Sequence, residues 1–218
     1  MASRDFRDRL HRRAFAANVT LDAGLEAALE SYYRLLANWN SKINLTSFPL
    51  VPDGEDESVD RLLIEPLAAV RHLPGRAQKW LDAGSGGGSP AIPMKLAQPG
   101  LRLHMVEAKT RKAAFLREAV RSLGLEHTEV VTSRFEMLLT KPELHEALDV
   151  VTIRAVRLGI GTMVTLQAFL KKGGRLMHFC GTDRADIDGV AAAMELLETH
   201  PLLRSNQSHL AVFRKVRN

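Results

Sequence analysis

The chain has 218 residues, a net charge of +5 and 45% hydrophobic residues, a composition ordinary for one globular domain. It has no apolar run of about 18 residues, and its N-terminus is charged throughout, so we expect neither a membrane span nor a secretory signal. The single cysteine, Cys180, excludes an intramolecular disulfide and a cysteine-cluster metal site, and we expect a cytoplasmic protein.

Positive charge is concentrated in three segments, 1–15, 109–121 and 202–218. The last of these holds four basic residues and no acidic one. Clustered basic charge favours a polyanionic partner through counterion release. A simply solvated surface is the alternative that charge alone leaves open.

The first 72 residues have a helical pattern. Apolar residues recur every three or four positions between Leu21 and Ile43, which predicts an amphipathic helix. Thr20 or Asp22 can cap the start of this helix, because both side chains accept hydrogen bonds from backbone N–H groups.

An acidic segment follows at 51–60 and predicts a mobile surface loop, since it is rich in turn-forming residues. The next segment, 61–74, resumes a helical pattern that Pro66 interrupts. We therefore expect residues 1–75 to form a helical extension packed on the rest of the chain.

From residue 79 onward, short apolar runs alternate with amphipathic segments. The apolar runs predict strands at 79–83, 101–108, 128–133, 147–155, 175–180 and 208–216. Predicted helices occupy 90–97, 110–124, 158–171 and 184–198. This alternation is typical of a mostly parallel sheet with helices on both faces, so residues 76–218 are expected to form one α/β domain.

A glycine-rich stretch, WLDAGSGGGSPAIP at 80–93, joins the first predicted strand to the first predicted helix of this domain. A flexible linker would not have such flanks, and the dinucleotide motif G-x-G-x-x-G fails because its sixth position is Ser89. The glycines that allow a sharp turn and a close ligand approach are Gly84, Gly86 and Gly88. Asp82 precedes them and favours a ligand with positive charge over a pyrophosphate. S-adenosylmethionine, with its ammonium and sulfonium groups, is such a ligand.

A second acid, Glu107, ends the next predicted strand, 25 residues after Asp82. In open α/β sheets, ligands bind beyond the carboxyl ends of the strands, and an acid there accepts hydrogen bonds from both ribose hydroxyls. The alternative is a surface glutamate at a strand end. With the glycine stretch, the two acids predict a ligand that contains adenosine.

Five stretches together resemble the RsmG family, also called GidB, of class I methyltransferases of small-subunit ribosomal RNA. They are NWNSKINLTS (38–47), the glycine stretch, VEAKTRKAAFLRE (106–118), SRFEML (133–138) and IRAV (153–156). The resemblance implies a Rossmann-like α/β fold with a mostly parallel seven-stranded sheet, helices on both faces and an N-terminal helical extension. It also implies methyl transfer from S-adenosylmethionine to N7 of a guanine in the 530-loop region of 16S ribosomal RNA.

The resemblance assigns residue roles as well. Gly84 and Ser89 are expected to border the methionine part of the cofactor, and Asp82, Gly86 and Gly88 are further expected cofactor contacts in the same loop. The remaining expected contacts are Glu107, Ala108 and Lys109 at the ribose and adenine edge, Phe135 and Glu136 at the adenine, and Arg154 near the cofactor and the entry of the target base. The expected RNA contacts are Asn44, Arg111, Lys112 and His209, with Asn44 either RNA-facing or structural.

The chain departs from the family pattern at four places. Ser89 stands where a hydrophobic residue is usual, and Ala91 stands where glycine is usual. Leu62 replaces a common histidine, and Cys180 replaces a lysine. The last two positions lie where RNA or the target base is held, so they bear on substrate engagement more than on cofactor binding.

The chemistry implied by the resemblance needs little from the protein. Guanine N7 has a lone pair and no proton to lose, so no catalytic base is expected and Arg154 serves only to position. The eight histidines lack metal-ligand spacing, so no metal is expected. The expected partner is 16S ribosomal RNA or an assembling small subunit, bound by a monomer. The alternatives are a class I methyltransferase of a small molecule or protein, and a non-catalytic RNA-binding relative.

Overall fold

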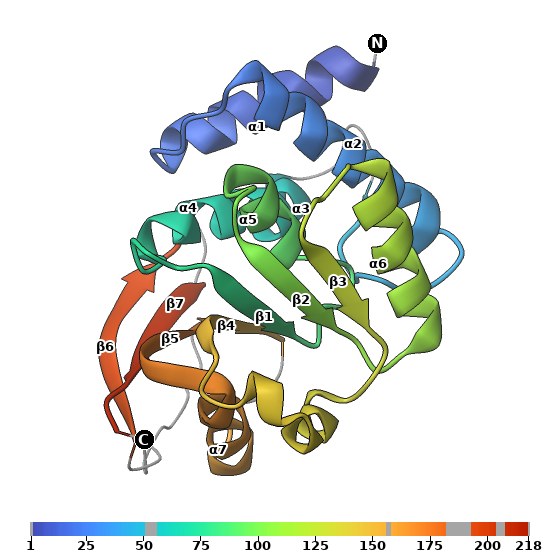
Figure 1. The fold of residues 1–218 in the computed structure, drawn as a ribbon. Coiled ribbons are helices and arrows are strands. Elements are labelled where there is room, and N and C mark those ends of the chain that lie inside the picture. Colours follow the sequence, from blue (N-terminus) through green and yellow to red (C-terminus); the bar gives the residue numbers. More distant parts are fainter. Residues whose placement is uncertain (1, 51–55, 156–157, 182–192, 204–207, 218) are drawn as a thin grey trace.

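One seven-stranded sheet forms the centre of the computed structural model, which describes residues 2–50, 56–155, 158–181, 193–203 and 208–217 (Figure 1). The strand order is β3-β2-β1-β4-β5-β7-β6. The strands are β1 (Lys79–Ala83), β2 (Arg102–Val106), β3 (Thr128–Val131), β4 (Leu148–Arg154), β5 (Leu170–Cys180), β6 (Met194–Pro201) and β7 (His209–Lys215). Neighbours from β3 to β5 pair in parallel, and β7 runs antiparallel to β5 and β6. The predicted mostly parallel, seven-stranded sheet is confirmed.

Both faces of this sheet are buried. Successive side chains of a strand point to opposite faces, so Trp80 belongs to one apolar cluster and Leu81 to the other. Along β4, Val150 and Val151 divide in the same way. A sheet buried on both sides explains why the central strands have near-continuous apolar runs in the sequence.

Helices cover the two faces unequally. The helices are α1 (Ala2–Ala16), α2 (Ala23–Asn40), α3 (Asp56–Val59), α4 (Glu65–Ala69), α5 (Ala91–Ala97), α6 (Thr110–Ser122) and α7 (Ile160–Phe169). Residues of α2, α4, α5 and α6 pack in the cluster that contains Trp80, whereas α7 and the 3-10 turn Phe135–Thr140 pack in the cluster that contains Leu81. No described helix is both long and apolar enough to cross a membrane.

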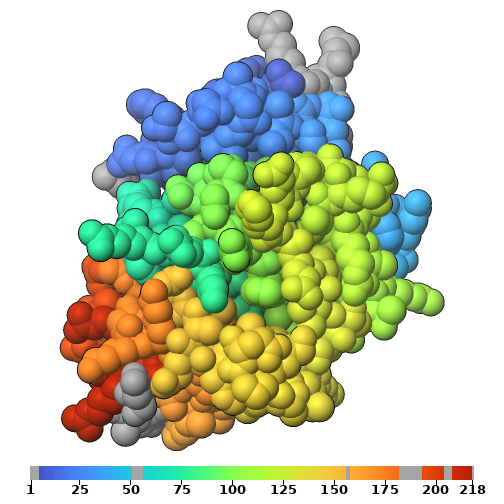
Figure 2. All heavy atoms as spheres, in the orientation of Figure 1, coloured from blue at the N-terminus to red at the C-terminus, as the bar shows by residue number. Residues whose placement is uncertain are grey.

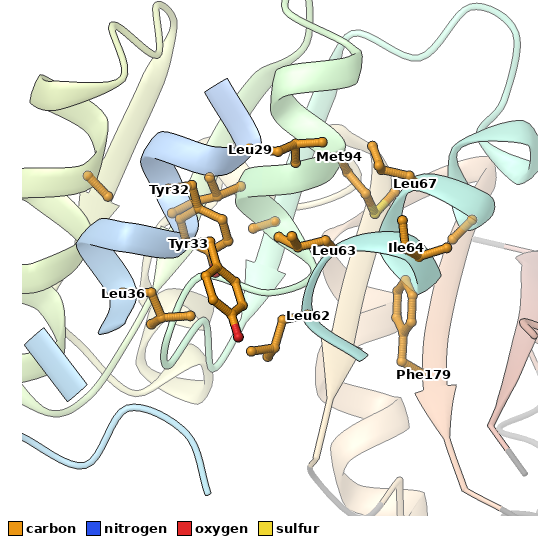
Figure 3. Packing of buried hydrophobic residues seen from close by; sticks show 14 of the residues in the cluster. Leu29, Tyr32, Tyr33, Leu36, Leu62, Leu63, Ile64, Leu67, Met94 and Phe179 are labelled. Carbon is orange, nitrogen blue, oxygen red and sulfur yellow. The ribbon is translucent and has the colours of Figure 1, made fainter. Parts of the chain in front are cut away.

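The N-terminal helices share a core with the sheet. The side chain of Asp22 caps α2 by accepting a hydrogen bond from the Leu25 N–H at 2.7 Å, which confirms the predicted cap. The buried face of α2, with Leu29 and Leu36, meets Leu63 and Met94 (Figure 3). Figure 2 shows the resulting blue layer of α1 and α2 lying directly on the green elements below it. The division of the chain at residue 75 stays a prediction.

Helix begins earlier than predicted after the acidic segment. Residues 51–55 lie outside the described part of the chain, but 56–60 is helical rather than a loop, with its acidic residues at the helix N-terminus where the helix dipole favours them. The expected interruption near Pro66 is a π-turn, Asp60–Ile64. Pro66 has no N–H to donate to the preceding turn, and the Glu65 N–H bonds back five residues to the Asp60 carbonyl.

The predicted helix at 184–198 is wrong in its last part. Residues 182–192 lie outside the described residues, and from Met194 the chain is the edge strand β6. Its sequence, MELLETHP, contains strong helix formers. Pairing with β7, a contact between distant parts of the chain, overrides this local preference.

The predicted helix at 158–171 is also too long. Helix α7 ends at Phe169, and Leu170 already pairs with Leu148 in the sheet. A side chain at Gly174 would lie 3.0 Å from the Leu148 carbonyl, so glycine permits the close passage of β5 past β4 at this irregular start of the pairing.

Candidate functional site

The glycine-rich loop lies at the carboxyl end of β1 and leads into α5. The backbone N–H groups of Gly84 and Ser85 donate to the Val106 carbonyl at 2.9 and 3.0 Å, which ties the loop to the end of β2. Gly84, Gly86 and Gly88 have φ angles of 77°, 53° and 89°. Only glycine adopts these left-handed conformations without strain, so the predicted sharp turn is present.

The glycines of this loop face different surroundings. An added Cβ at Gly88 would lie 2.5 Å from the Ile92 side chain, and one at Gly87 would lie 3.3 Å from both Leu36 and the Leu45 carbonyl. At Gly86, the nearest atom is 3.8 Å away. The back of the loop therefore packs against the helices, and Gly86 lies on its open side.

Asp82 lies buried beneath the loop, with 1% of its surface exposed. Its Oδ1 accepts a hydrogen bond from the Thr152 hydroxyl at 2.6 Å, and Thr152 in turn accepts one from the Trp80 indole at 2.8 Å. Its Oδ2 is buried without a hydrogen-bond partner in the described structure. Burial raises the pKa of Asp82 to about 6, against the lowering effect of the Thr152 hydrogen bond.

Glu107 is held between the loop and the start of α6. Its two carboxylate oxygens accept from the Gly86 N–H at 2.9 Å and from the Lys109 N–H at 2.7 Å. A carboxylate offers about four acceptor positions, so two bonds leave capacity for two more. Ala108 and Lys109, which follow it, are exposed.

The predicted adenine contacts lie in the next crossover. Phe135 and Glu136 begin the 3-10 turn that follows β3, with Phe135 half-buried and Glu136 exposed. The Ser133 N–H donates to the Glu107 carbonyl at 3.2 Å, which holds the segment before this turn beside Glu107. The carboxyl ends of β1, β2 and β3 thus bring the glycine loop, Glu107 and the Phe135 turn to one edge of the sheet.

Arg154, at the end of β4, is the centre of a buried polar network. Its guanidinium donates to Glu65 Oε2 at 2.7 Å, to the Ser89 hydroxyl at 3.2 Å and to the Arg61 carbonyl. It also lies 4.5 Å above the Phe179 ring. Burial lowers the pKa of Arg154, and the Glu65 carboxylate opposes that effect.

Glu65 is the residue of this network that sequence reasoning missed. It is fully buried, and its second oxygen accepts from Arg61 at 3.2 Å and from the Ser208 hydroxyl. An acid four residues after an arginine, inside an apolar helical pattern, was the available signal. Its partners Arg154 and Ser208 are too distant in sequence for that signal to identify them.

The model of the family described as rRNA small subunit methyltransferase G (GidB) matches residues 25–209. The chain is 35% identical to the protein named ribosomal RNA small subunit methyltransferase G from Xanthomonas axonopodis pv. citri, over 90% of each chain. It is 36% identical to the protein of the same name from Desulfotalea psychrophila, over 81% of this chain and 78% of that one. The chain belongs to the GidB family.

Solved structures agree on the fold of this GidB protein. A SAM-dependent methyltransferase from Aquifex aeolicus superposes with a TM-score of 0.56 at 13% identity, over 75% of this chain and 94% of that one. TrmN from Thermus thermophilus gives 0.54 at 15% identity, over 69% and 49%. Fold and family together identify a methyltransferase whose cofactor is S-adenosylmethionine.

The family stretch at 38–47 of the GidB protein packs against the side of the glycine loop that faces the helices. The Asn40 side-chain oxygen accepts from the N–H groups of Leu45 and Thr46 at 2.8 and 3.0 Å, and buried Leu45 contacts Gly87. Asn44 itself is exposed.

The predicted RNA contacts do not form one cluster. Arg111 is exposed and Lys112 half-exposed in the first turns of α6, which follows β2. His209 begins β7, and β1, β4 and β5 separate β7 from β2 in the sheet.

Cys180 pairs with His209 across β5 and β7. Burial raises the pKa of the Cys180 thiol, which does not favour the thiolate that a nucleophile needs.

Two arginines of the N-terminal basic segment form ion pairs within the fold. Arg7 pairs with Glu30 at 2.7 Å, and Arg13 pairs with Asp60. These arginines hold α1 against α2 and the π-turn, so they contribute less to an external positive field than their number in the sequence indicates.

Proposed function

We propose that this GidB protein transfers the methyl group of S-adenosylmethionine to N7 of a guanine in the 530-loop region of 16S ribosomal RNA. The observation that carries the proposal is the family match over residues 25–209, to proteins named for small-subunit ribosomal RNA. The substrate is this RNA, either free or in an assembling small subunit.

The methionine part of the cofactor lies, in this proposal, along the glycine loop. Asp82 Oδ2 is a buried acceptor without a partner in the described structure, which suits a ligand that carries an ammonium group. Gly84 is exposed, Gly86 lies on the open side of the loop, and Ser89 closes the loop beside Arg154. Gly88 contributes through its tight packing on Ile92 rather than by facing the ligand.

The adenosine part lies at Glu107 and the turn after β3. The two unused acceptor positions of Glu107 match the two hydroxyls of a ribose. Exposed Ala108 and Lys109 border the ribose and adenine edge, and half-buried Phe135 with Glu136 flanks the adenine ring.

Arg154 is a positioning residue in this proposal. Its donors are directed to Glu65, Ser89 and the Arg61 carbonyl, so it fixes the end of the glycine loop against α4. When bound, S-adenosylmethionine supplies a sulfonium methyl group. Guanine N7 offers its lone pair without losing a proton, so no side chain of this protein acts as a base. The protein aligns the two reactants and excludes water.

The RNA-facing charges in this proposal are Lys109, Arg111 and Lys112, at the start of α6 beside the ribose position. His209 and exposed Asn44 are proposed as further contacts. We also propose that the protein acts as a monomer in the cytoplasm, where it meets ribosomal RNA or an assembling small subunit.

A methylation assay with labelled cofactor tests the proposed function. Small-subunit RNA that lacks the modification is incubated with the protein, digested to nucleosides and separated. We expect label in 7-methylguanosine, and less of it with Asp82→Asn, whose cofactor affinity is reduced. Label on another acceptor only, or cofactor binding with no transfer to RNA, would contradict the proposal.

The RNA contacts have a separate test in the salt dependence of RNA binding. For Arg111→Ala/Lys112→Ala, we expect the slope of log affinity against log salt to become shallower by about one per lost phosphate contact. An unchanged slope would remove these residues from the interface.

A further inference from the structure

Two histidines and a glutamate from separate segments meet at the edge of the sheet. His72 ends the 3-10 turn Val70–His72, which follows α4, and Glu198 and His200 lie on the edge strand β6. One side-chain ligand atom of each residue lies within 4.8 Å of the other two. The His72 and His200 rings stack with their centroids 3.8 Å apart.

One ring nitrogen of His200 is buried without a hydrogen-bond partner in the described structure. Its Nε2 is buried and lies 2.8 Å from a Glu198 oxygen, but the described structure gives this atom no hydrogen bond of acceptable geometry. Glu198 and His200 are two positions apart on a strand, so their side chains share one face of the sheet. The Arg175 guanidinium donates to the His72 carbonyl at 2.7 Å and so holds the end of the 3-10 turn Val70–His72 in place.

We propose that His72, Glu198 and His200 bind one Zn²⁺ ion, with water as the fourth ligand. Two imidazole nitrogens and one carboxylate oxygen are a donor set typical of zinc. Bonds of about 2.0–2.2 Å require the ligand atoms to draw closer together than 4.8 Å. Glu198 and His200 already lie 2.8 Å apart, so the movement is an approach of the half-buried His72 side chain toward this pair.

The ion acts as a clamp on the sheet edge and takes no part in methyl transfer. Strands β4, β5 and β7 separate β6 from β1, which carries Asp82. As an edge strand, β6 pairs with β7 alone, so a link to the turn after α4 adds an attachment that the sheet itself does not supply. The histidine spacing in the sequence gave no sign of the site, because His72 and β6 are far apart in the sequence.

Calorimetric titration of the metal-free full-length protein with Zn²⁺ tests the site, and Co²⁺ absorption spectra report the coordination. We expect one ion per chain and the intense visible absorption of a four-coordinate Co²⁺ ion. Loss of an outer-shell partner alone lowers metal affinity about 10- to 100-fold, so His200→Ala and Glu198→Gln should weaken Zn²⁺ binding at least that much. Zn²⁺ should also raise the Tm of the wild-type protein and leave that of His200→Ala unchanged.

His104→Ala is the matched control, because His104 also lies beside a glutamate, with its Nδ1 3.3 Å from Glu129, but in a pair rather than a triad. It should bind Zn²⁺ like the wild type. Glu198→Gln alters an exposed side chain and guards against loss of binding through misfolding. Absence of binding to the wild-type protein, or equal affinity in all variants, would overturn the proposal.

Discussion

The charges of Arg154 and Glu65 are buried together, and each is stable there only because of the other. Glu65 is fully buried and accepts from Arg154 at 2.7 Å. Removal of one partner of a buried pair leaves an uncompensated charge, which costs about 3–5 kcal/mol. We therefore expect Glu65→Gln to lower the free energy of unfolding by that amount in urea denaturation.

Two further variants separate charge from packing at this pair. The exposed Glu143→Gln should leave the free energy of unfolding unchanged. The double variant Glu65→Leu/Arg154→Met should regain most of the stability, since apolar side chains of similar volume often replace a buried pair without loss. A double variant less stable than Glu65→Gln would show that the network stabilises the fold beyond charge balance.

Asp82 gives a prediction on pH dependence. Its folded pKa of about 6 lies above the ordinary value of 3.8, so the folded state holds this proton more tightly than the unfolded state does. Protonated Asp82 therefore contributes stability that is fully present below about pH 4 and is lost as the pH rises through about 6. At about 1.4 kcal/mol per pKa unit, the loss is about 3 kcal/mol.

Asp82→Asn removes that dependence while keeping the shape of the side chain. The difference in free energy of unfolding, variant minus wild type, should increase from about pH 4 to about pH 7, as measured by urea denaturation at each pH. Affinity for S-adenosylmethionine should fall in the same variant, because the neutral amide cannot balance an ammonium group. A difference in stability that is constant with pH would contradict the buried charge.

At the scale of elements, the turn after α2 couples the helices to the glycine-rich loop. The Asn40 side chain holds the N–H groups of Leu45 and Thr46, and Leu45 contacts Gly87. Buried donors that lose their acceptor cost about 1–3 kcal/mol. We expect Asn40→Ala to lose stability in this range and to bind the cofactor more weakly, measured by denaturation and calorimetry.

Ser41→Ala is the neighbouring control, because its hydroxyl donates to the Asn38 carbonyl at an exposed position. It should change neither quantity appreciably. Weakened cofactor binding in Ser41→Ala equal to that of Asn40→Ala would point to a general disturbance of the turn.

Local pattern predicted most elements and the carboxyl edge of the sheet at which the candidate site lies. Asp82 is the penultimate residue of β1 and Glu107 directly follows β2, so their place at the carboxyl edge follows from the fold class. The errors occur where distant contacts decide. Pairing with β7 makes β6 a strand, and Glu65 becomes part of the site only because Arg154 and Ser208 reach it from other segments.

At the scale of the whole molecule, one apolar cluster runs from the N-terminal helices into the sheet. Leu10 of α1, Leu29 of α2 and Trp80 of β1 all belong to it and are fully buried. Residues 76–218 alone would expose the face of the sheet that these helices cover. We expect that fragment to lack a cooperative thermal unfolding transition, as measured by circular dichroism, and a cooperative transition would show that the methyltransferase domain folds by itself.

The buried network around Glu65 also determines how much sequence change it tolerates. Three donors, Arg61, Arg154 and Ser208, converge on one carboxylate. Replacement of Arg61 or Ser208 leaves Glu65 Oε1 with one donor, whereas replacement of Arg154 removes the donor to Oε2. If Glu65 is replaced, all three lose their shared partner at once. Mutational tolerance is therefore asymmetric, with redundancy between Arg61 and Ser208 and none at Arg154 or Glu65.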